Sequence, residues 1–238
     1  MAKGTGLGSA LWVDQYVLSN DFRNVETNGG PALLDVTGID SSAHERIGGV
    51  RDGRIAGTAY LNDATDRAHP VLSQLPTADT ILSYAESDDA VGDRAASLVA
   101  KQIGYDGDRA EDGMLTFDVE ALSSTLGLAW GRLGTPGVTT ETSTSNQASI
   151  DNAAASSNGL RAFLHVTAFT GTNCTIEVQE SSDDGAGDAF AAIGTFTSVT
   201  AVGAEAIEVT GAVERYLRVA ITGGTFSSIT FAVNIARL

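Results

Sequence analysis

Residues 160–182 read LRAFLHVTAFTGTNCTIEVQESS, and this stretch decides the fold class of the chain. Apolar side chains alternate with their neighbours along its first half, and alternation resumes at Ile176 and Val178 after a turn that contains Gly171. A period of two predicts β-strands with one buried face. The alternating set is Leu160, Ala162, Leu164 and Val166.

The same rhythm continues to the C-terminus. Further strands are predicted at 190–199, 206–209, 215–221 and 229–235, with turn signals at intervals of about ten residues. This spacing is typical of a β-sandwich, so residues 159–238 are expected to form one.

The first 135 residues have a different organisation. A short helix is predicted at 68–75, ended by Pro76, and residues 40–53 are expected to be a loop. Residues 94–103 fit a helix or a strand equally well, and the sequence leaves both open. Strands are predicted at 11–18, 32–36, 54–61, 80–85, 114–122 and 126–132.

Three segments are therefore predicted. Residues 1–135 form one domain, 136–158 a linker rich in small polar residues, and 159–238 a C-terminal β-sandwich.

Composition limits the partners. The chain of 238 residues has a formal net charge of −16, and both its first 135 residues and the remainder are acidic. Tight wrapping of nucleic acid is not expected, since that binding depends on Lys and Arg neutralising phosphates. No apolar run of about 18 residues or signal-like N-terminus is seen, so we expect no membrane span and synthesis in a cytoplasm.

No catalytic, cofactor or metal site is predicted. The three histidines, His44, His69 and His165, stand in unrelated contexts and lack zinc-ligand spacing. The single cysteine, Cys174, excludes a disulfide within the chain and is expected to pack in a strand. The acidic loops at 106–113 and 183–188 fail the calcium-loop pattern or fit solvated turns better.

Two segments are candidate assembly surfaces. Arginine pairs well with carboxylates of a neighbouring subunit, so the loop around 40–54 is predicted to make inter-subunit contacts. The glycine-rich N-terminus is predicted to be a mobile or interface arm. The loop residues are Arg46, Arg51, Asp52 and Arg54, and the arm residues are Lys3, Leu7, Leu11 and Trp12.

The order of elements resembles the tail tube (major tail) proteins of long non-contractile-tailed phages. The resemblance is carried by Leu11-Trp12-Val13, the charged loop at 40–54, the strand at 54–61, the helix at 68–75 and the closing strand Leu128-Ala129-Trp130-Gly131-Arg132. The segments 164–172, 178–183 and 215–219 look like the extra β-sandwich found at the end of many such proteins.

The resemblance implies a fold and a role. It implies a tail-tube fold, in which two packed sheets form a barrel-like subunit with a short flanking helix, followed by a C-terminal β-sandwich. It also implies a virion protein of the tail, made in a host bacterial cytoplasm, that forms stacked hexameric rings. The C-terminal β-sandwich is then expected to be an appended module on the outer surface, whose removal leaves tube assembly intact. The tube would contact itself and other tail proteins, and would pass DNA through an acidic lumen without sequence-specific binding.

Two other function classes are weighed against this one. A capsid decoration or receptor- or glycan-binding β-sandwich protein would form stable monomers or trimers rather than tubes. A glycan hydrolase would need two carboxylates across a cleft. The acidic residues that can be placed lie in turns or on outward strand faces, so no enzymatic activity is expected.

Overall fold

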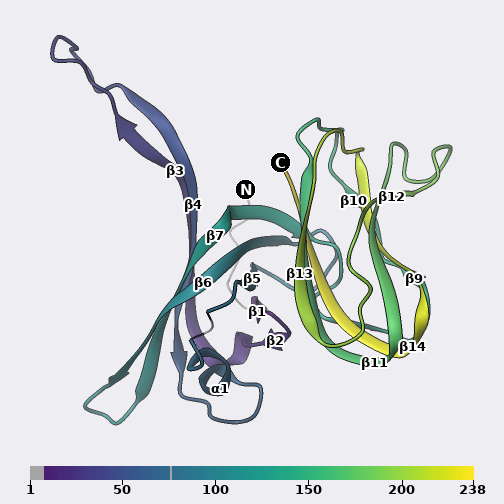
Figure 1. Ribbon diagram of the computed structural model, residues 1–238, viewed down its shortest axis with the longest axis horizontal. Helices are drawn as coiled ribbons and strands as arrows, with labels where there is room; N and C mark the ends of the chain where they lie inside the picture. Colours follow the sequence, from purple (N-terminus) through teal and green to yellow (C-terminus); the bar gives the residue numbers. More distant parts are fainter. Residues whose placement is uncertain (1–7, 76) are drawn as a thin grey trace.

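The computed structural model describes residues 8–75 and 77–238, and its strands form two lobes that lie side by side (Figure 1). The N-terminal lobe holds β1 to β7 and the C-terminal lobe holds β8 to β14. Every strand pairing of the described residues is antiparallel. The predicted mainly-β fold class is confirmed.

The N-terminal lobe contains seven strands and two short helices. They are β1 (Ala10–Val13), β2 (Tyr16–Val17), a 3-10 helix (Ser19–Asp21), β3 (Phe22–Asp35), β4 (Arg46–Tyr60), α1 (Ala68–Leu72), β5 (Thr80–Ala85), β6 (Arg94–Arg109) and β7 (Leu115–Leu133). Residues 94–103, which the sequence left open, are part of a strand. The short helix is confirmed, and Pro76, its predicted stop, lies outside the described residues.

Two sheet layers pack against each other in this lobe. One layer has the order β3-β4-β7-β6, and the other continues from β6 through β5 to β1 and β2. The long strands β6 and β7 belong to both layers, because bulges between Ser97 and Gly104 let them bend. The layers are thus two halves of one continuous sheet folded over a core.

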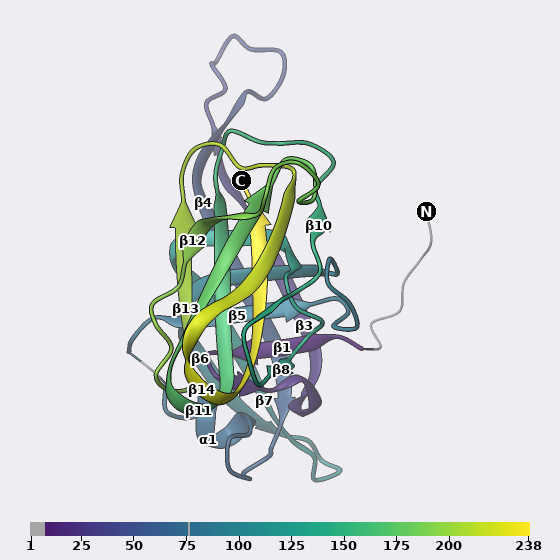
Figure 2. The same ribbon diagram turned by 90° about the vertical axis from the view of Figure 1, so that its right-hand side faces the viewer.

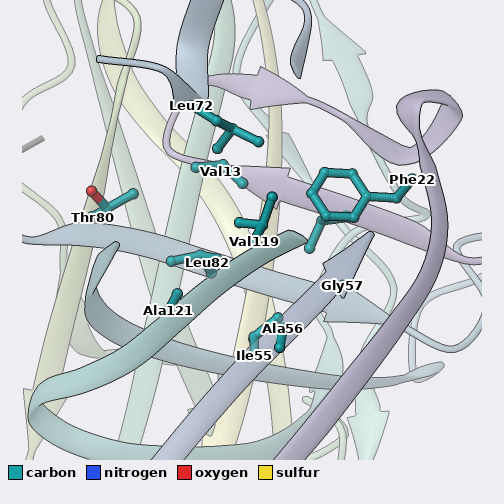
Figure 3. Close-up of a pocket in the computed structure, with 11 residues that line it drawn as sticks. Val13, Phe22, Ile55, Ala56, Gly57, Leu72, Thr80, Leu82, Val119 and Ala121 are labelled. Atoms are coloured by element: carbon teal, nitrogen blue, oxygen red, sulfur yellow. The ribbon is translucent and has the colours of Figure 1, made fainter. Parts of the chain in front are cut away.

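The core of the N-terminal lobe lies between these layers. Val13 and Leu82 project from one layer and Ile55 and Val119 from the other, while Leu72 of α1 covers one end (Figure 3). A small apolar pocket remains among them, lined almost wholly by aliphatic side chains. Such a lining offers no group for chemistry, so we assign this pocket to packing.

A long hairpin, β3 with β4, projects beyond both lobes (Figures 1 and 2). Gly29–Pro31 has the composition of a turn and 40–53 was expected to be a loop, but residues 29–31 and 46–53 lie in strands and only 40–45 is loop. Residues 22–35 and 46–60 are continuous strands, and the connecting loop is confined to 36–45. The backbone pairing of Gly29 with Gly53 explains the error, since glycines that looked like turn residues lie within the ladder.

Those two glycines are needed where β7 crosses the hairpin. A Cβ on Gly53 would lie 2.3 Å from the backbone nitrogen of Leu128, and one on Gly29 would lie 2.7 Å from the Leu128 Cβ. Leu128 therefore sits directly on backbone at this crossing, which fixes where the hairpin leaves the body of the lobe.

The C-terminal lobe is a sandwich built on two strands of 22 residues. Its strands are β8 (Thr139–Glu141), β9 (Ser145–Asn146), β10 (Ile150–Asp151), β11 (Leu160–Ser181), β12 (Ala191–Thr195), β13 (Gly203–Val209) and β14 (Tyr216–Arg237). β11 pairs with β14 along its whole length, with β13 beside its first half and β12 beside its second. The bend in both long strands brings the two halves face to face.

The bend explains why the sequence predicted more strands than exist. The turn expected at Gly171 is a kink inside β11, and the predicted strands 215–221 and 229–235 are one strand, β14. A Cβ on Gly171 would lie 2.5 Å from the Cα of Phe226, and one on Gly224 would lie 2.4 Å from the carbonyl oxygen of Asn173. Glycine at the kink therefore allows the two bent strands to stay paired.

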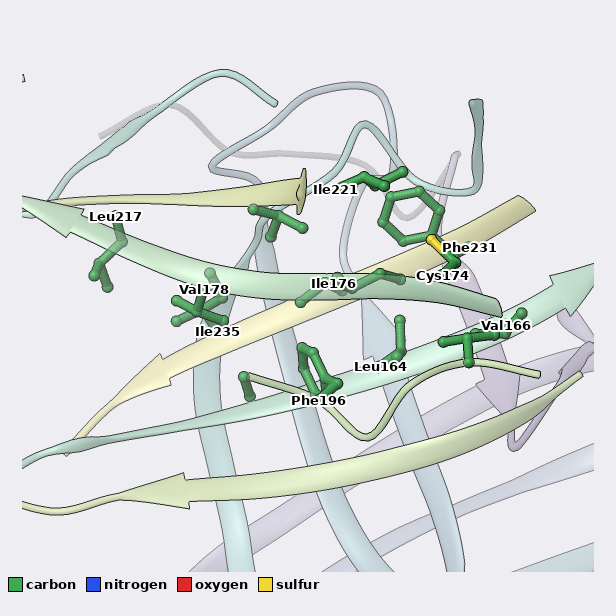
Figure 4. Packing of buried hydrophobic residues seen from close by; sticks show 14 of the residues in the cluster. Leu164, Val166, Cys174, Ile176, Val178, Phe196, Leu217, Ile221, Phe231 and Ile235 are labelled. Carbon is green, nitrogen blue, oxygen red and sulfur yellow. The ribbon is translucent and has the colours of Figure 1, made fainter. Parts of the chain in front are cut away.

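The core of this lobe follows the predicted alternation. Leu164, Val166, Ile176 and Val178 of β11 face Phe231 of β14 and its neighbours inside the sandwich (Figure 4). Residues 136–158, expected as a linker, run along β14 and pair with it through β8, β9 and β10. The two lobes are also joined by backbone pairing of Arg132 and Leu133 with β14.

Candidate assembly surfaces

The projecting hairpin exposes apolar side chains on both of its faces. Leu34 pairs across the ribbon with Ile47, and these side chains are 50% and 52% exposed. Leu33 lies on the opposite face and is 70% exposed, and Val50 is 85% exposed. Isolated exposed aliphatic residues are common on proteins, but a group of them on one projection marks an interaction surface. Residues 31–51 are called the hairpin tip below.

Hydrogen bonds at the base of the loop 36–45 hold the hairpin tip in shape. His44 Nδ1 lies 3.0 Å from Asp35 Oδ2, and the Glu45 amide donates to the Thr37 hydroxyl at 3.0 Å. The Thr37 hydroxyl and amide both donate to Asp35, and these bonds lower the pKa of the Asp35 carboxyl below its ordinary value. The loop at 36–45 is thus tied to the ends of both strands.

The four predicted inter-subunit residues are spread along β4 and do not form a cluster. Arg46 lies opposite Asp35 near the loop, and Arg51 lies opposite Pro31 in the hairpin tip. The Asp52 carboxylate accepts a hydrogen bond from the Ser123 hydroxyl at 3.1 Å. Their role between subunits stays a prediction.

Arg54 lies in the body of the sheet and is paired within the subunit. Its Nε lies 2.5 Å from Glu120 Oε1, with both side chains about 40% exposed. Arg54 therefore belongs to the layer β3-β4-β7-β6 rather than to a mobile loop.

The layer β3-β4-β7-β6 has two edges that no strand of the described residues covers. β3 pairs with β4 alone, and β6 pairs with β5 only over Ala95–Ala100. From Lys101 to Arg109, β6 has a neighbour on the β7 side and none in the described chain on the other. Bare edges are templates for pairing with another chain.

One face of this layer is polar and acidic. The register aligns Glu26, Ala56, Glu120 and Gly104 in one row across the four strands, and the next row holds Asp118 and Asp106. The Thr58 hydroxyl donates to Asp118 Oδ1 at 2.9 Å. The charged groups of this polar face are the carboxylates of Glu26, Asp106, Asp108, Asp118 and Glu120 and the cations of Arg54 and Lys101.

The predicted N-terminal arm must be shortened. Leu11 and Trp12 lie in β1, which pairs with β5, and they are 2% and 0% exposed. They belong to the core of the subunit because β1 is an inner strand of its layer, so an arm would have to precede Ala10. Lys3 and Leu7 lie outside the described residues.

The other polar candidates have structural explanations. Asp183 accepts hydrogen bonds from the amides of Gly187 and Asp188, and these bonds lower its pKa. His69 Nδ1 lies 3.0 Å from the Tyr105 hydroxyl, beside the ring of Phe117. Burial raises the pKa of the Tyr105 hydroxyl to about 12.

Metal and membrane features were sought over residues 8–75 and 77–238. No group of three or more His, Cys, Asp or Glu side chains in these ranges is placed to hold a metal ion. Within the same ranges no helix has the length and apolar character needed to cross a membrane.

Comparison with known proteins gave weak likenesses only. No protein-family model and no curated protein matches the chain. It is similar to a chain of a native gene transfer agent virion, with 16% identity and a TM-score of 0.44 over 54% of this chain and 98% of that one. A tail chain of the empty gene transfer agent particle, refined with C6 symmetry, gives 16% and 0.42 over 55% and 98%.

A third likeness extends over both lobes. The crystal structure of the Dit protein of phage SPP1, described as a hub adsorption apparatus, is 9% identical with a TM-score of 0.34, over 96% of this chain and 99% of that one. Identities and TM-scores this low establish neither a family nor a function.

The exposed apolar side chains of the hairpin tip were missed by sequence reasoning. The signal was present in residues 32–34, which read Ala-Leu-Leu, and in residues 47–50, which read Ile-Gly-Gly-Val between charged neighbours. It was taken for a short strand and a loop, because the glycines concealed the pairing of the two segments.

Proposed function

We propose that this protein is a virion structural protein that polymerises as stacked hexameric rings into a phage tail tube, the conduit for DNA during ejection. The observation that carries the proposal is the pair of bare edges on one four-stranded layer. The edges belong to different strands, β3 and β6, and lie on opposite sides of the layer. The protein would act in the tail, together with other tail proteins, and without enzymatic activity.

Bare edges on opposite sides favour a ring. Pairing of the β3 edge of one copy with the β6 edge of the next is a head-to-tail contact, which generates a closed ring when its rotation closes. Closure leaves no edge exposed, and this removes the aggregation hazard of the isolated subunit. The six-fold number is taken from the resemblance to tail tube proteins.

The polar face supports the role as a conduit. In a closed ring one face of the layer lines the lumen and the other packs on the core. Val25, Val119 and Tyr105 occupy the core side, so the face with Glu26, Asp106 and the other carboxylates would line the lumen. An acidic lining repels the phosphate backbone, which lets DNA pass without being held.

The hairpin tip supports stacking of rings. It projects beyond the body of the subunit and carries apolar side chains on both faces, so it is suited to lie between two surfaces of neighbouring copies. Burial of those side chains would stabilise the stack.

Cross-linking across the proposed ring contact tests the proposal. Glu26→Cys on β3 is combined in turn with Gly104→Cys, Asp106→Cys and Asp108→Cys on β6, and each product is oxidised after assembly. Neighbouring strands lie about 4.8 Å apart, so one register brings two thiols together. Cys174, the one natural cysteine, is buried and should form no cross-link.

We expect covalent ladders that end at the hexamer for one pair, and monomers for each single variant. Electron microscopy of the same samples should show rings or tubes. Stable monomers or trimers with no cross-link from any pair would refute the ring and favour a decoration or receptor-binding protein. A lumen lined mainly by Arg and Lys would refute the acidic conduit alone.

A further inference from the structure

A chain of buried polar side chains crosses the junction between the two lobes. Ser83 of β5 and Ser97 of β6 come from the N-terminal lobe, and His165 of β11 and Asn234 of β14 come from the C-terminal lobe. All four side chains are at most 1% exposed. Buried polar groups are costly unless they are hydrogen-bonded, so their meeting at one junction calls for an explanation.

The four side chains form one continuous hydrogen-bonded chain. Asn234 Nδ2 donates to the Ser97 hydroxyl at 2.7 Å, and the Ser97 and Ser83 hydroxyls lie 2.5 Å apart. Ser83 Oγ lies 2.7 Å from His165 Nε2, and His165 Nδ1 lies 2.7 Å from the carbonyl oxygen of Asp14.

These contacts define the state of the histidine. A carbonyl accepts, so Nδ1 carries the proton and donates to Asp14. Nε2 is then free to accept from Ser83, which in turn accepts from Ser97. Each hydroxyl donates once and accepts once when His165 is neutral. A proton on Nε2 would turn this acceptor into a donor. The donor and acceptor roles of the Ser83 and Ser97 hydroxyls would then have to reverse.

Apolar packing surrounds the chain and seals it from water. The indole of Trp12 stacks on His165, with ring centroids 6.1 Å apart. Ile81 and Ala129 of the N-terminal lobe pack with Phe163 of the C-terminal lobe in one buried cluster. Two surfaces that belong to different lobes are thus joined as closely as the layers of a single core.

We propose that this chain is an acid-sensitive clasp, which fixes the C-terminal lobe on the N-terminal lobe in one orientation and is loosened by a proton on His165. The proposal concerns the isolated subunit and does not depend on tube assembly. Apolar packing alone tolerates shifts of one surface over another, whereas the hydrogen bonds between Asn234 and Ser97 and between Ser83 and His165 form in one alignment only.

The surroundings of His165 offer little compensation for a positive charge. Its strand neighbours are Ala204 on β13 and Ala232 on β14, which carry no charge. Asp14 contacts His165 through its backbone carbonyl, and the titratable or charged side chains that line the adjoining pocket beside Thr167 are those of Tyr16, Asp66 and Arg67. Burial lowers the pKa of His165 to about 4, opposed only in part by the hydrogen bond to the Asp14 carbonyl.

The carboxyl of Asp14, the residue whose backbone carbonyl accepts from His165, is itself half-buried. Burial raises its pKa, while a hydrogen bond from the Ile81 amide opposes the shift. This carboxyl therefore takes up a proton at a higher pH than an ordinary aspartate does.

Each lobe contains a residue whose signal reports the unfolding of that lobe. Trp12 lies in the N-terminal lobe, and its fluorescence can be followed alone once Trp130 is replaced by Phe. Cys174 is buried in the core of the C-terminal lobe, so its reaction with a thiol reagent reports opening there. Both are measured on the full chain against denaturant concentration at pH 7.5 and pH 5.0.

In the parent protein the two transitions should coincide at pH 7.5, and both midpoints should fall at pH 5.0. His165→Gln should show a clearly smaller fall, whereas the exposed control His44→Gln should match the parent. Transitions that separate in the parent at pH 7.5, or an equal acid shift in His165→Gln and the parent, would overturn the proposal.

A second variant serves if His165→Gln does not fold. Ser97→Ala removes the middle of the chain from the N-terminal lobe, and the clasp predicts earlier reaction of Cys174 in the other lobe. Ser41→Ala, on the exposed loop of the hairpin, is its control. If Ser97→Ala shifts the Trp12 transition and leaves the reaction of Cys174 unchanged, the lobes are not clasped.

Discussion

The hairpin tip gives the sharpest test of how rings would stack. In the double variant Leu34→Ser/Ile47→Ser, one apolar cross-strand pair becomes polar while the charge and the β-ladder are kept. The two side chains are 50% and 52% exposed in the subunit, so about half of each is left to bury in an assembly. Full burial of such a side chain is worth about 1.5–3 kcal/mol, so half-burial of two side chains gives about 1.5–3 kcal/mol for the pair in each subunit.

This loss can be measured as a change in assembly. A loss of about 1.5–3 kcal/mol per subunit corresponds to a rise of about 10- to 150-fold in the protein concentration needed for tubes. Sedimentation of a dilution series, with electron microscopy of pellet and supernatant, gives that concentration. We expect separate rings to persist in the supernatant, because the ring contact lies on the strand edges and not on the hairpin tip.

The matched control is Leu61→Ser/Val202→Ser, at side chains that are 44% and 47% exposed and lie outside the hairpin. It should assemble like the parent. If the control and the hairpin variant lower tube formation equally, general loss of surface apolarity explains the effect. If the hairpin variant forms tubes at the parental concentration, the hairpin tip does not stack rings.

Three further predictions concern stability. Gly53→Ala should lower the free energy of unfolding by about 1–3 kcal/mol, because its Cβ would lie 2.3 Å from β7 backbone, whereas Gly30→Ala, with open space, should change it little in denaturant titrations. The pKa of His165 is about 4 in the folded protein and about 6.5 in the unfolded chain. The contribution of neutral His165 to the free energy of unfolding is therefore complete above pH 6.5. It is lost as the pH falls toward 4, by at most about 3 kcal/mol. The raised pKa of Asp14 acts in the opposite sense, so the fall should steepen in Asp14→Asn, measured by unfolding across this pH range. Deletion of Gly159–Leu238 should abolish folding of the remainder, seen as loss of cooperative thermal unfolding, which reverses the expectation for an appended module.

Much of the fold follows from local alternation. The inward positions of β11 around Leu164 and Ile176 were predicted, because one buried face imposes a period of two on the sequence. The helix α1 was found from helical spacing, and β5, β7 and the second half of β4 were found as strands. The predicted strands were too short. Gly29, Gly53 and Gly171 look like turn residues in the sequence, but in the structure they are close-contact positions within strands.

The candidate surfaces were harder to predict for a different reason. Arg46 and Arg51 were chosen for their charge, whereas the more distinctive feature of the hairpin is the exposure of Leu33 and Val50. Exposure depends on what the rest of the chain leaves uncovered, and a local pattern holds no information about that. Ser83, likewise, looks like an ordinary outward residue of a strand until the second lobe covers it.

The two lobes solve the problem of an unfinished β-sheet in different ways. The face of the N-terminal layer that contains β5 and β6 is covered within the chain by the C-terminal lobe, where Ser83 and Ser97 are hydrogen-bonded to His165 and Asn234. In the proposed ring, the edges of the layer that contains β3 and β4 would be covered by another copy. A face can be covered by any well-packed lobe, whereas an edge needs another strand. An identical subunit always supplies a strand of the right length and register. The internal clasp and the open edges are therefore complementary, because a subunit with a fixed C-terminal lobe presents its two edges at one constant angle, and a ring closes only if that angle is the same in every copy.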